Sequence, residues 1–119
     1  MKTLLDANAC LHYLLNDIEE QANITANAIA EGSEVTLEVL AEIVYVLDGV
    51  YNITKPLISK TLIEFLGEVS CLRDFVAVSA LEFYSENNLD FVDCILLAEN
   101  QINKRIILTF DKKLKRKLS

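Results

Sequence analysis

The sequence of 119 residues predicts an α/β fold, in which one domain has a short parallel sheet of about four strands covered by helices on both faces. Short apolar or β-branched stretches alternate along the chain with longer segments whose apolar residues recur at helical spacing. Strands that alternate with helices form parallel sheets with right-handed crossovers. A hydrophobic fraction of 52%, with one proline and three glycines, indicates a compact globular chain.

The first predicted strand, Thr3–Leu5, stops at Asp6 and leads into a helix from Ala9 to Leu15. A second helix, Glu19–Glu31, ends at Gly32, a residue type that commonly terminates helices. Ligands of open α/β sheets bind just beyond the carboxyl ends of the strands, which is where Asp6 lies. The alternative is that Asp6 only caps the helix that follows it.

The middle of the chain predicts one strand and two helices. The strand is Glu34–Leu37, and Glu38–Leu47 follows as a helix whose apolar residues keep helical spacing. Glu42 lies one turn after the start of that helix, on a face that the apolar residues do not occupy. A second helix begins at Thr54, because a threonine cap followed by proline in the first turn is a typical helix start.

The last third predicts two more strands. Phe75–Val78 is β-branched and predicts the third strand, followed by a helix over Ala80–Glu86. Another helix covers Asp90–Ile102, with its first residue as N-cap. Arg105–Thr109 predicts the fourth strand, which runs into a basic helical tail.

Charge is unevenly distributed along the chain, whose net charge is −7. Residues 1–103 carry four basic and 17 acidic residues, whereas residues 104–119 carry seven basic residues and one acidic residue. Such asymmetry is a hint of contact with a polyanion or a protein partner, although a solvated tail is the alternative.

Composition also excludes several classes of protein. No stretch approaches the about 18 uninterrupted apolar residues of a membrane span. Polar residues interrupt any signal-peptide core near the N-terminus, so we expect a cytoplasmic protein. Cys10, Cys71 and Cys94 are odd in number and form no C-x-x-C pair, which predicts core filling. His12 is the only histidine, which excludes histidine-rich metal sites.

Acidic residues recur at equivalent places in this scheme. Asp6 ends the first strand, Asp111 lies just past the fourth, and Glu42 sits in the helix after the second. Asp90 and Asp93 begin the helix that precedes the fourth strand. Because a parallel sheet brings the ends of its strands to one edge, we expect these carboxylates to converge. Each one alone has an ordinary structural alternative. This is helix capping for Asp6 and Asp90, a favourable helix-dipole position for Asp93, a solvated helix position for Glu42 and a turn position for Asp111.

Convergence of carboxylates has an energetic cost. Two carboxylates about 6 Å apart, at an effective dielectric constant of about 20, repel each other by roughly 2.8 kcal/mol. A cation offsets this repulsion, and oxygen ligands without cysteine or histidine favour Mg²⁺ or Mn²⁺ over zinc. A divalent ion held by carboxylates at a cleft is a means of hydrolysing phosphodiesters.

Four segments carry a resemblance to a known family. They are LLDANACLHYLL at Leu4–Leu15, LEVLAEIVYVL at Leu37–Leu47, LDFVDCILLA at Leu89–Ala98 and ILTFDKKLKR around Leu108. In this order the chain resembles a PIN-domain ribonuclease, specifically the small VapC-like toxins of bacterial and archaeal toxin–antitoxin pairs. The resemblance covers nearly the whole chain.

The resemblance implies a PIN-like three-layer sandwich over residues 1–119, with strand order 3-2-1-4 and a basic C-terminal segment over 104–119. It also implies a metal-dependent endoribonuclease that hydrolyses RNA, is inhibited by an antitoxin protein and is usually dimeric. Carried over by position, the catalytic and metal-binding acids are Asp6, Glu42, Asp93 and Asp111, with Asp90 as an auxiliary ligand. Asn8 and Thr109 match supporting residues.

One departure from the family pattern bears on activity. The family's usual Asp-Thr-Asn is here Asp6-Ala7-Asn8, so a hydroxyl that orients the ligands is missing, and a catalytically impaired PIN-like binding protein stays an alternative. A receiver-like Mg²⁺-binding signalling module is disfavoured, because its adjacent acids are absent here.

The basic tail predicts contacts with RNA phosphates through Lys112, Lys113, Lys115 and Arg116.

Overall fold

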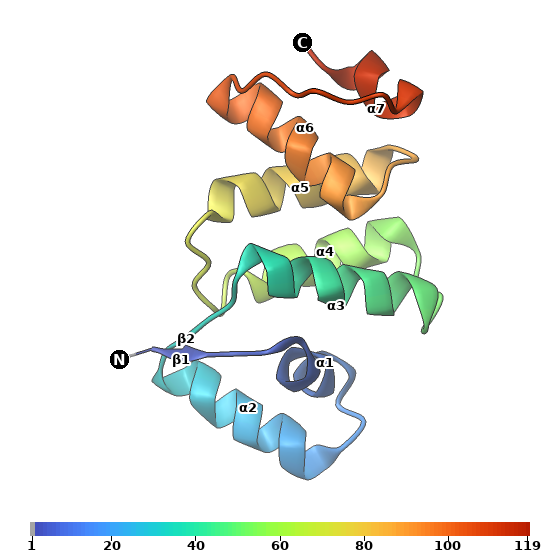
Figure 1. The fold of residues 1–119 in the computed structure, drawn as a ribbon. Coiled ribbons are helices and arrows are strands. Elements are labelled where there is room, and N and C mark those ends of the chain that lie inside the picture. Colours follow the sequence, from blue (N-terminus) through green and yellow to red (C-terminus); the bar gives the residue numbers. More distant parts are fainter. Residues whose placement is uncertain (1) are drawn as a thin grey trace.

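The computed structural model describes residues 2–119 as a stack of helices with a small sheet near the N-terminus (Figure 1). Helices lie in successive pairs, from α1 and α2 at one end to α6 and α7 at the other. The elements in chain order are β1 (Thr3–Leu4), α1 (Ala7–Leu15), α2 (Glu19–Glu31), β2 (Ser33–Glu34), α3 (Leu37–Gly49), α4 (Lys55–Phe65), α5 (Asp74–Glu86), α6 (Phe91–Asn103) and α7 (Lys112–Lys117).

Local capping explains where several helices begin. The Asp6 carboxylate accepts a hydrogen bond from the backbone N–H of Ala9, 2.8 Å away, so α1 starts two residues earlier than predicted. The Thr36 hydroxyl accepts from the N–H of Val39 at 3.1 Å and starts α3. The predicted second helix matches α2 at both ends.

The sheet confirms the α/β class and the parallel direction, but it is smaller than predicted. β1 and β2 pair in parallel, with Thr3 opposite Ser33 and Leu4 opposite Glu34. An isolated parallel bridge joins Glu34 to Ser70, on the side of β2 away from β1. Within residues 2–119 these are the two strands present, so the prediction of four is not confirmed.

The predicted third strand over Phe75–Val78 is wrong, because these residues lie in the first turns of α5. Their β-branched composition favoured a strand, but burial follows a different pattern. The buried residues of this helix are Val76, Ala77, Ala80, Leu81 and Tyr84. That spacing is helical, and packing of this face outweighs the weak local preference for strand.

The predicted fourth strand over Arg105–Thr109 is extended but has no strand partner within the described chain. Its apolar side chains are open to solvent, with exposed fractions of 97% for Ile106 and 85% for Leu108. Phe110, just beyond it, is 90% exposed. Of the predicted sheet order 3-2-1-4, only the pair of β1 and β2 is therefore formed within residues 2–119.

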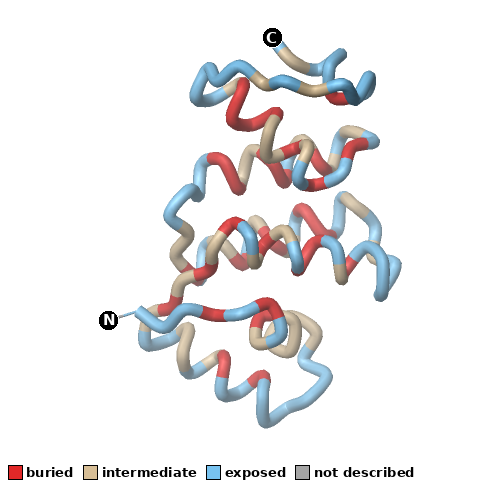
Figure 2. Tube along the Cα trace, in the orientation of Figure 1, coloured by how far each residue is buried: buried red, intermediate tan, exposed pale blue. Residues whose placement is uncertain are grey.

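The core lies mainly between the stacked helix pairs (Figure 2), so the predicted three-layer sandwich is not confirmed beyond the α/β class. The largest fully buried side chains include Phe65, Leu40, Ile43, Leu81 and Leu114. The Cα radius of gyration is 14.8 Å, compared with about 13.5 Å for a compact chain of this length, so the stack is elongated. No described helix has the length and apolar character needed to cross a membrane.

One buried carboxylate links the last part of α6 to the start of α5. Glu99 of α6 forms an ion pair with Arg73, which precedes α5, and accepts a hydrogen bond from Asn103 Nδ2 at 2.7 Å. Asn103 and the Arg73 guanidinium hold the pKa of Glu99 below its ordinary value, although burial opposes this. The ionised form is therefore the one that the fold stabilises.

The Glu99 contacts predict a loss of stability in acid. Because the pKa of Glu99 is lower in the folded state, its contribution is present at neutral pH and is lost as pH falls below about 4.3, the ordinary value for glutamate. Glu99→Gln should lower the free energy of unfolding at pH 7 by about 1–2 kcal/mol and flatten its dependence on pH in acid. Urea unfolding between pH 3 and pH 7 measures both.

The exposed Glu82 of α5 provides the matched control. Glu82→Gln should leave the stability at pH 7 and its acid dependence within error of the parent. Identical pH profiles for the two variants would contradict the role given to Glu99.

Candidate functional site

Three acidic residues gather where α6 and α7 begin. Asp90 occupies the N-cap position of α6 without forming a capping hydrogen bond through its side chain, and Asp93 lies in the first turn. Asp111 caps α7. The pKa of Asp93 is raised, first by partial burial and then by the negative charges of Asp111 and Asp90. These three residues, here called the α6 acid group, therefore share one electrostatic environment.

Asp111 is held firmly in place by its neighbours. Its Oδ1 accepts a hydrogen bond from the N–H of Leu114 at 2.9 Å, and its own N–H donates to Thr109 Oγ1 at 3.0 Å. Leu114 is 1% exposed and anchors α7 in the core. Thr109 thus supports Asp111 through a hydrogen bond.

Asp6 lies at the opposite end of the stack from this group, since it caps α1 whereas Asp111 caps α7 (Figure 1). It borders a shallow hollow of about 210 Å³ together with Asn8 and His12. Among the described contacts no hydrogen bond joins Asn8 to Asp6. The predicted support of Asp6 by Asn8 is therefore not formed here.

Glu42 is exposed on α3, and the predicted convergence of Asp6, Glu42, Asp93 and Asp111 at one sheet edge is not found. Residues 2–119 contain no group of three or more histidine, cysteine or acidic side chains placed to hold a metal ion. The physical reason is the unpaired segment 105–109. Without a strand beside β1, the sheet has no common edge that would bring Asp6 to Asp111.

A basic cleft lies next to the α6 acid group. Its volume is about 330 Å³, and its basic wall is formed by Lys113, Arg116 and Lys117 of α7. The opposite wall is formed by Glu86 at the end of α5 and by the loop of residues 87–89 between α5 and α6. Two residues predicted to contact RNA, Lys113 and Arg116, therefore face this cleft, whereas Lys112 and Lys115 are exposed outside it.

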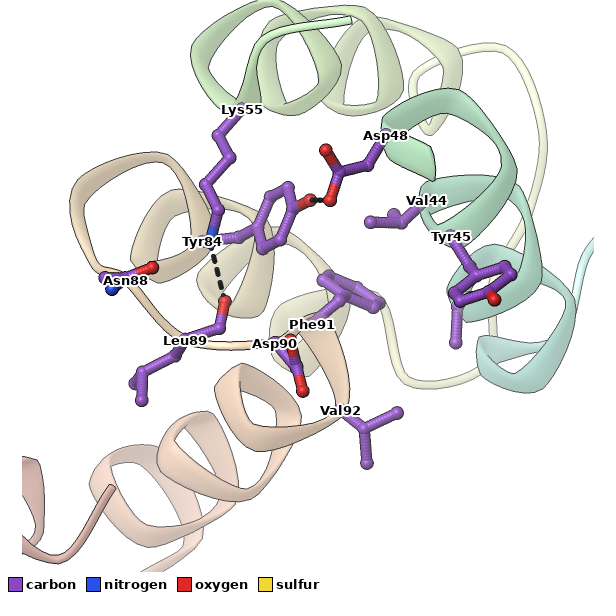
Figure 3. Close-up of a pocket in the computed structure, with 11 residues that line it drawn as sticks. Val44, Tyr45, Asp48, Lys55, Tyr84, Asn88, Leu89, Asp90, Phe91 and Val92 are labelled. Atoms are coloured by element: carbon purple, nitrogen blue, oxygen red, sulfur yellow. Dashed lines mark hydrogen bonds between the residues drawn. The ribbon is translucent and has the colours of Figure 1, made fainter. Parts of the chain in front are cut away.

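The sequence prediction missed a second cavity, which shares that loop (Figure 3). It has a volume of about 420 Å³ and lies between α3, α5 and the start of α6. Lys55 Nζ donates to the backbone oxygens of Asn87 and Leu89, at 3.1 and 2.7 Å. Its ammonium lies 4.3 Å from the centre of the Tyr84 ring, and the Tyr84 hydroxyl donates to Asp48 Oδ2 at 3.2 Å.

Burial raises the pKa of Tyr84, with Asp48 as the next cause, so its hydroxyl stays protonated and keeps donating. The sequence holds a weak signal for part of this cavity. Tyr45 and Asp48 stand three residues apart, which places them on one face of a helix. Nothing local links them to Lys55 or Tyr84.

Comparison of the chain with models of protein families identifies its family. The model of the PIN domain matches residues 3–117. The chain belongs to the PIN-domain family. PIN domains are generally metal-dependent nucleases, so the chain belongs at the coarse level among hydrolases that act on nucleic acids. No curated protein and no solved structure matched the chain in the corresponding comparisons.

The donor set of the α6 acid group fits the divalent cation that the PIN family implies. All its ligands would be carboxylate oxygens, which favour Mg²⁺ or Mn²⁺ over softer metals. Partial burial is the main cause of the raised pKa of Asp93, and the negative charges of Asp111 and Asp90 raise it further. Asp93, Asp111 and Asp90 thus supply the ligand type that such an ion needs, although as they lie here the three are not yet placed to hold it together.

Proposed function

We propose that this PIN domain is an Mg²⁺- or Mn²⁺-dependent endoribonuclease that hydrolyses RNA phosphodiester bonds. The observation that carries the proposal is the juxtaposition of the α6 acid group with the basic cleft of α7. Asp111 stands at the junction, because it joins the acid group and directly precedes the helix that carries Lys113 and Arg116.

The basic cleft and the α6 acid group have different roles in hydrolysing a phosphodiester. Lys113 and Arg116 bind the backbone phosphates and set the position of the strand, whereas base edges carry the sequence information. Asp93 and Asp111 bind the cation, with Asp90 beside them. A bound divalent cation supplies charge neutralisation at the scissile phosphate and a more acidic water.

In the catalytically competent form, Asp6 and Glu42 join these acids. Their part is inferred from the family resemblance, and it requires segment 105–109 to pair as the fourth strand beside β1. Two observations support this rearrangement. The side of β1 away from β2 has no strand partner in the described chain, and Leu4 on it is 63% exposed. Ile106 and Leu108, which are 97% and 85% exposed, stand two residues apart and so would lie on one face of such a strand.

Removing a ligand should abolish cleavage without loss of stability. Asp93→Asn should reduce the RNA cleavage rate in Mn²⁺ by about 100-fold or more, since lesser changes around metal ligands already cost 10–100-fold. Its melting temperature without metal should not fall, because the substitution relieves repulsion from Asp111 and Asp90. Rates with a fluorescent single-stranded RNA and thermal unfolding in EDTA measure these effects.

Asp74→Asn is the matched control, since Asp74 begins α5 and contributes to neither the acid group nor the cleft. It should cleave at the parental rate. Asp6→Asn should be as inactive as Asp93→Asn if Asp6 joins the competent site. Full cleavage by Asp93→Asn would overturn the proposal and favour the alternative, a PIN-like binding protein in which Ala7 marks impaired catalysis.

The rearrangement of segment 105–109 has its own test. On addition of Mn²⁺, hydrogen exchange of the amides of residues 106–109 should slow by about tenfold or more, since amides that enter a sheet become protected. The amide of Leu4, on the open edge of β1, should slow with them. Asp111→Asn should abolish this response. Unchanged exchange in an actively cleaving sample would contradict the fourth strand.

The resemblance to VapC-like toxins supports a role as the toxin of a toxin–antitoxin pair, with an antitoxin protein as partner and a homodimer as the active assembly. Exposed apolar side chains at the end of α3 and the start of α4, such as Val50 and Leu57, offer surface for association. Expression in bacteria should arrest growth, and Asp93→Asn should not. A chain that sediments as a monomer and leaves growth unaffected would contradict this role.

A further inference from the structure

We propose that the cavity between α3, α5 and the start of α6 is a nucleobase subsite that takes a guanine of single-stranded RNA. This inference rests on the proposed function, which makes RNA the substrate, and it names the base that lies beside the cleavage site. Its support comes from the walls of the cavity, its polar groups and its neighbours (Figure 3).

Aromatic rings line the cavity and provide surfaces for a base. Tyr45 of α3 is 76% exposed although it lines the cavity, so one face of its ring is free to stack. Tyr84 and Phe91 are buried and meet edge to face, with ring centres 5.9 Å apart. A free aromatic face beside a volume of about 420 Å³ suits a flat heterocycle, and stacking is a common means of holding single-stranded bases.

The polar groups in the cavity discriminate between bases. One oxygen of the Asp48 carboxylate accepts from Tyr84, while the other has no hydrogen-bond partner among the described contacts. A carboxylate accepts two parallel N–H groups, and guanine alone among the four bases carries a ring N–H beside an exocyclic amino group. Adenine and cytosine present a ring nitrogen lone pair beside the amino group, which a carboxylate repels.

Lys55 provides a hydrogen-bond donor to the same guanine that the Asp48 carboxylate binds. Its ammonium has three N–H groups, of which two donate to the backbone oxygens of Asn87 and Leu89. The remaining N–H is a donor for an acceptor such as the guanine carbonyl oxygen. Within the described chain Lys55 has no carboxylate partner within 4.0 Å, so its charge is available to this oxygen.

The cavity adjoins the groups proposed for cleavage, on the other side of the loop of residues 87–89 from the basic cleft. Asn88 and Leu89 line both this cavity and the basic cleft, and Asp90 of the α6 acid group lines the cavity as well. A nucleotide with its base in the cavity therefore places its phosphate toward Arg116 and the acid group. Cleavage should accordingly occur next to guanine.

Binding of nucleotides in EDTA tests the subsite apart from catalysis. Isothermal titration of the full chain with the four ribonucleoside 5′-monophosphates should give a dissociation constant for GMP about tenfold or more below the other three. Asp48→Asn should remove this preference, while Asp74→Asn should keep it. Arg116→Gln should weaken all four nucleotides alike and reduce the salt dependence of binding.

Exposed tyrosines provide a second comparison that does not disturb the core. Tyr45→Ala should weaken GMP binding by about tenfold, within the range for loss of one base-stacking contact, and Tyr45→Phe should retain it. Tyr51→Ala, outside the cavity, should bind like the parent.

Equal affinities for the four nucleotides, or a preference that survives Asp48→Asn, would overturn the guanine assignment, and the absence of any binding would overturn the subsite. The cleavage assay in Mn²⁺ reports separately on the proposed function. Guanine binding without cleavage would retain the subsite and reject the nuclease, whereas cleavage without base preference would do the reverse.

Discussion

The ammonium of Lys55 holds the part of the structure on which both candidate sites depend. By donating to the backbone oxygens of Asn87 and Leu89, it fixes the loop between α5 and α6 from a helix more than 30 residues away in the chain. One side of this loop is a wall of the aromatic cavity, and the other is a wall of the basic cleft. The loop also sets where α6 begins, and hence where Asp90 and Asp93 stand.

Helix capping and metal binding are compatible roles for the same carboxylates. Asp6 and Asp111 each use a carboxylate oxygen to accept a backbone N–H at the start of a helix. A carboxylate has about four acceptor positions, so a cap leaves most of them free for a cation. The capping bond also fixes the rotamer, which lowers the entropy lost when a ligand binds. The capping roles seen for these residues therefore do not compete with the proposed ligand roles.

Most helices were predicted from the sequence, because apolar spacing and the residues at helix ends are features of short stretches of chain. The N-cap role weighed for Asp6 depends on an N–H three residues away. The caps at Thr36 and Asp111 are equally local, but they were not predicted. The same locality explains the error at Phe75–Val78, where β-branched residues favoured a strand but the buried face needed a helix.

Long-range pairing was beyond such reasoning. Ser70, around which no strand was predicted, joins the sheet at Glu34. The apolar run Ile106–Leu108 suited a strand, but it has no strand partner within the described residues. The same distinction between local and long-range signals applies to the candidate site. Asp93 and Asp111 were identified from motifs, but the contact of Tyr84 with Asp48 spans 36 residues, and no periodicity encodes it.

The charge distribution constrains how this chain binds RNA. A net charge of −7 repels a polyanion at long range, so encounter depends on the positive end that α7 provides. That end would hold RNA weakly and in any orientation if phosphates were its only contacts, since phosphate contacts carry no sequence information. The aromatic cavity reached through the loop of residues 87–89 supplies uncharged stacking surface, which salt does not screen. Base stacking in the cavity therefore adds to the few phosphate contacts of the small basic cleft. Together they let an acidic protein bind RNA next to its acid group, whereas phosphate contacts alone would require a larger basic surface.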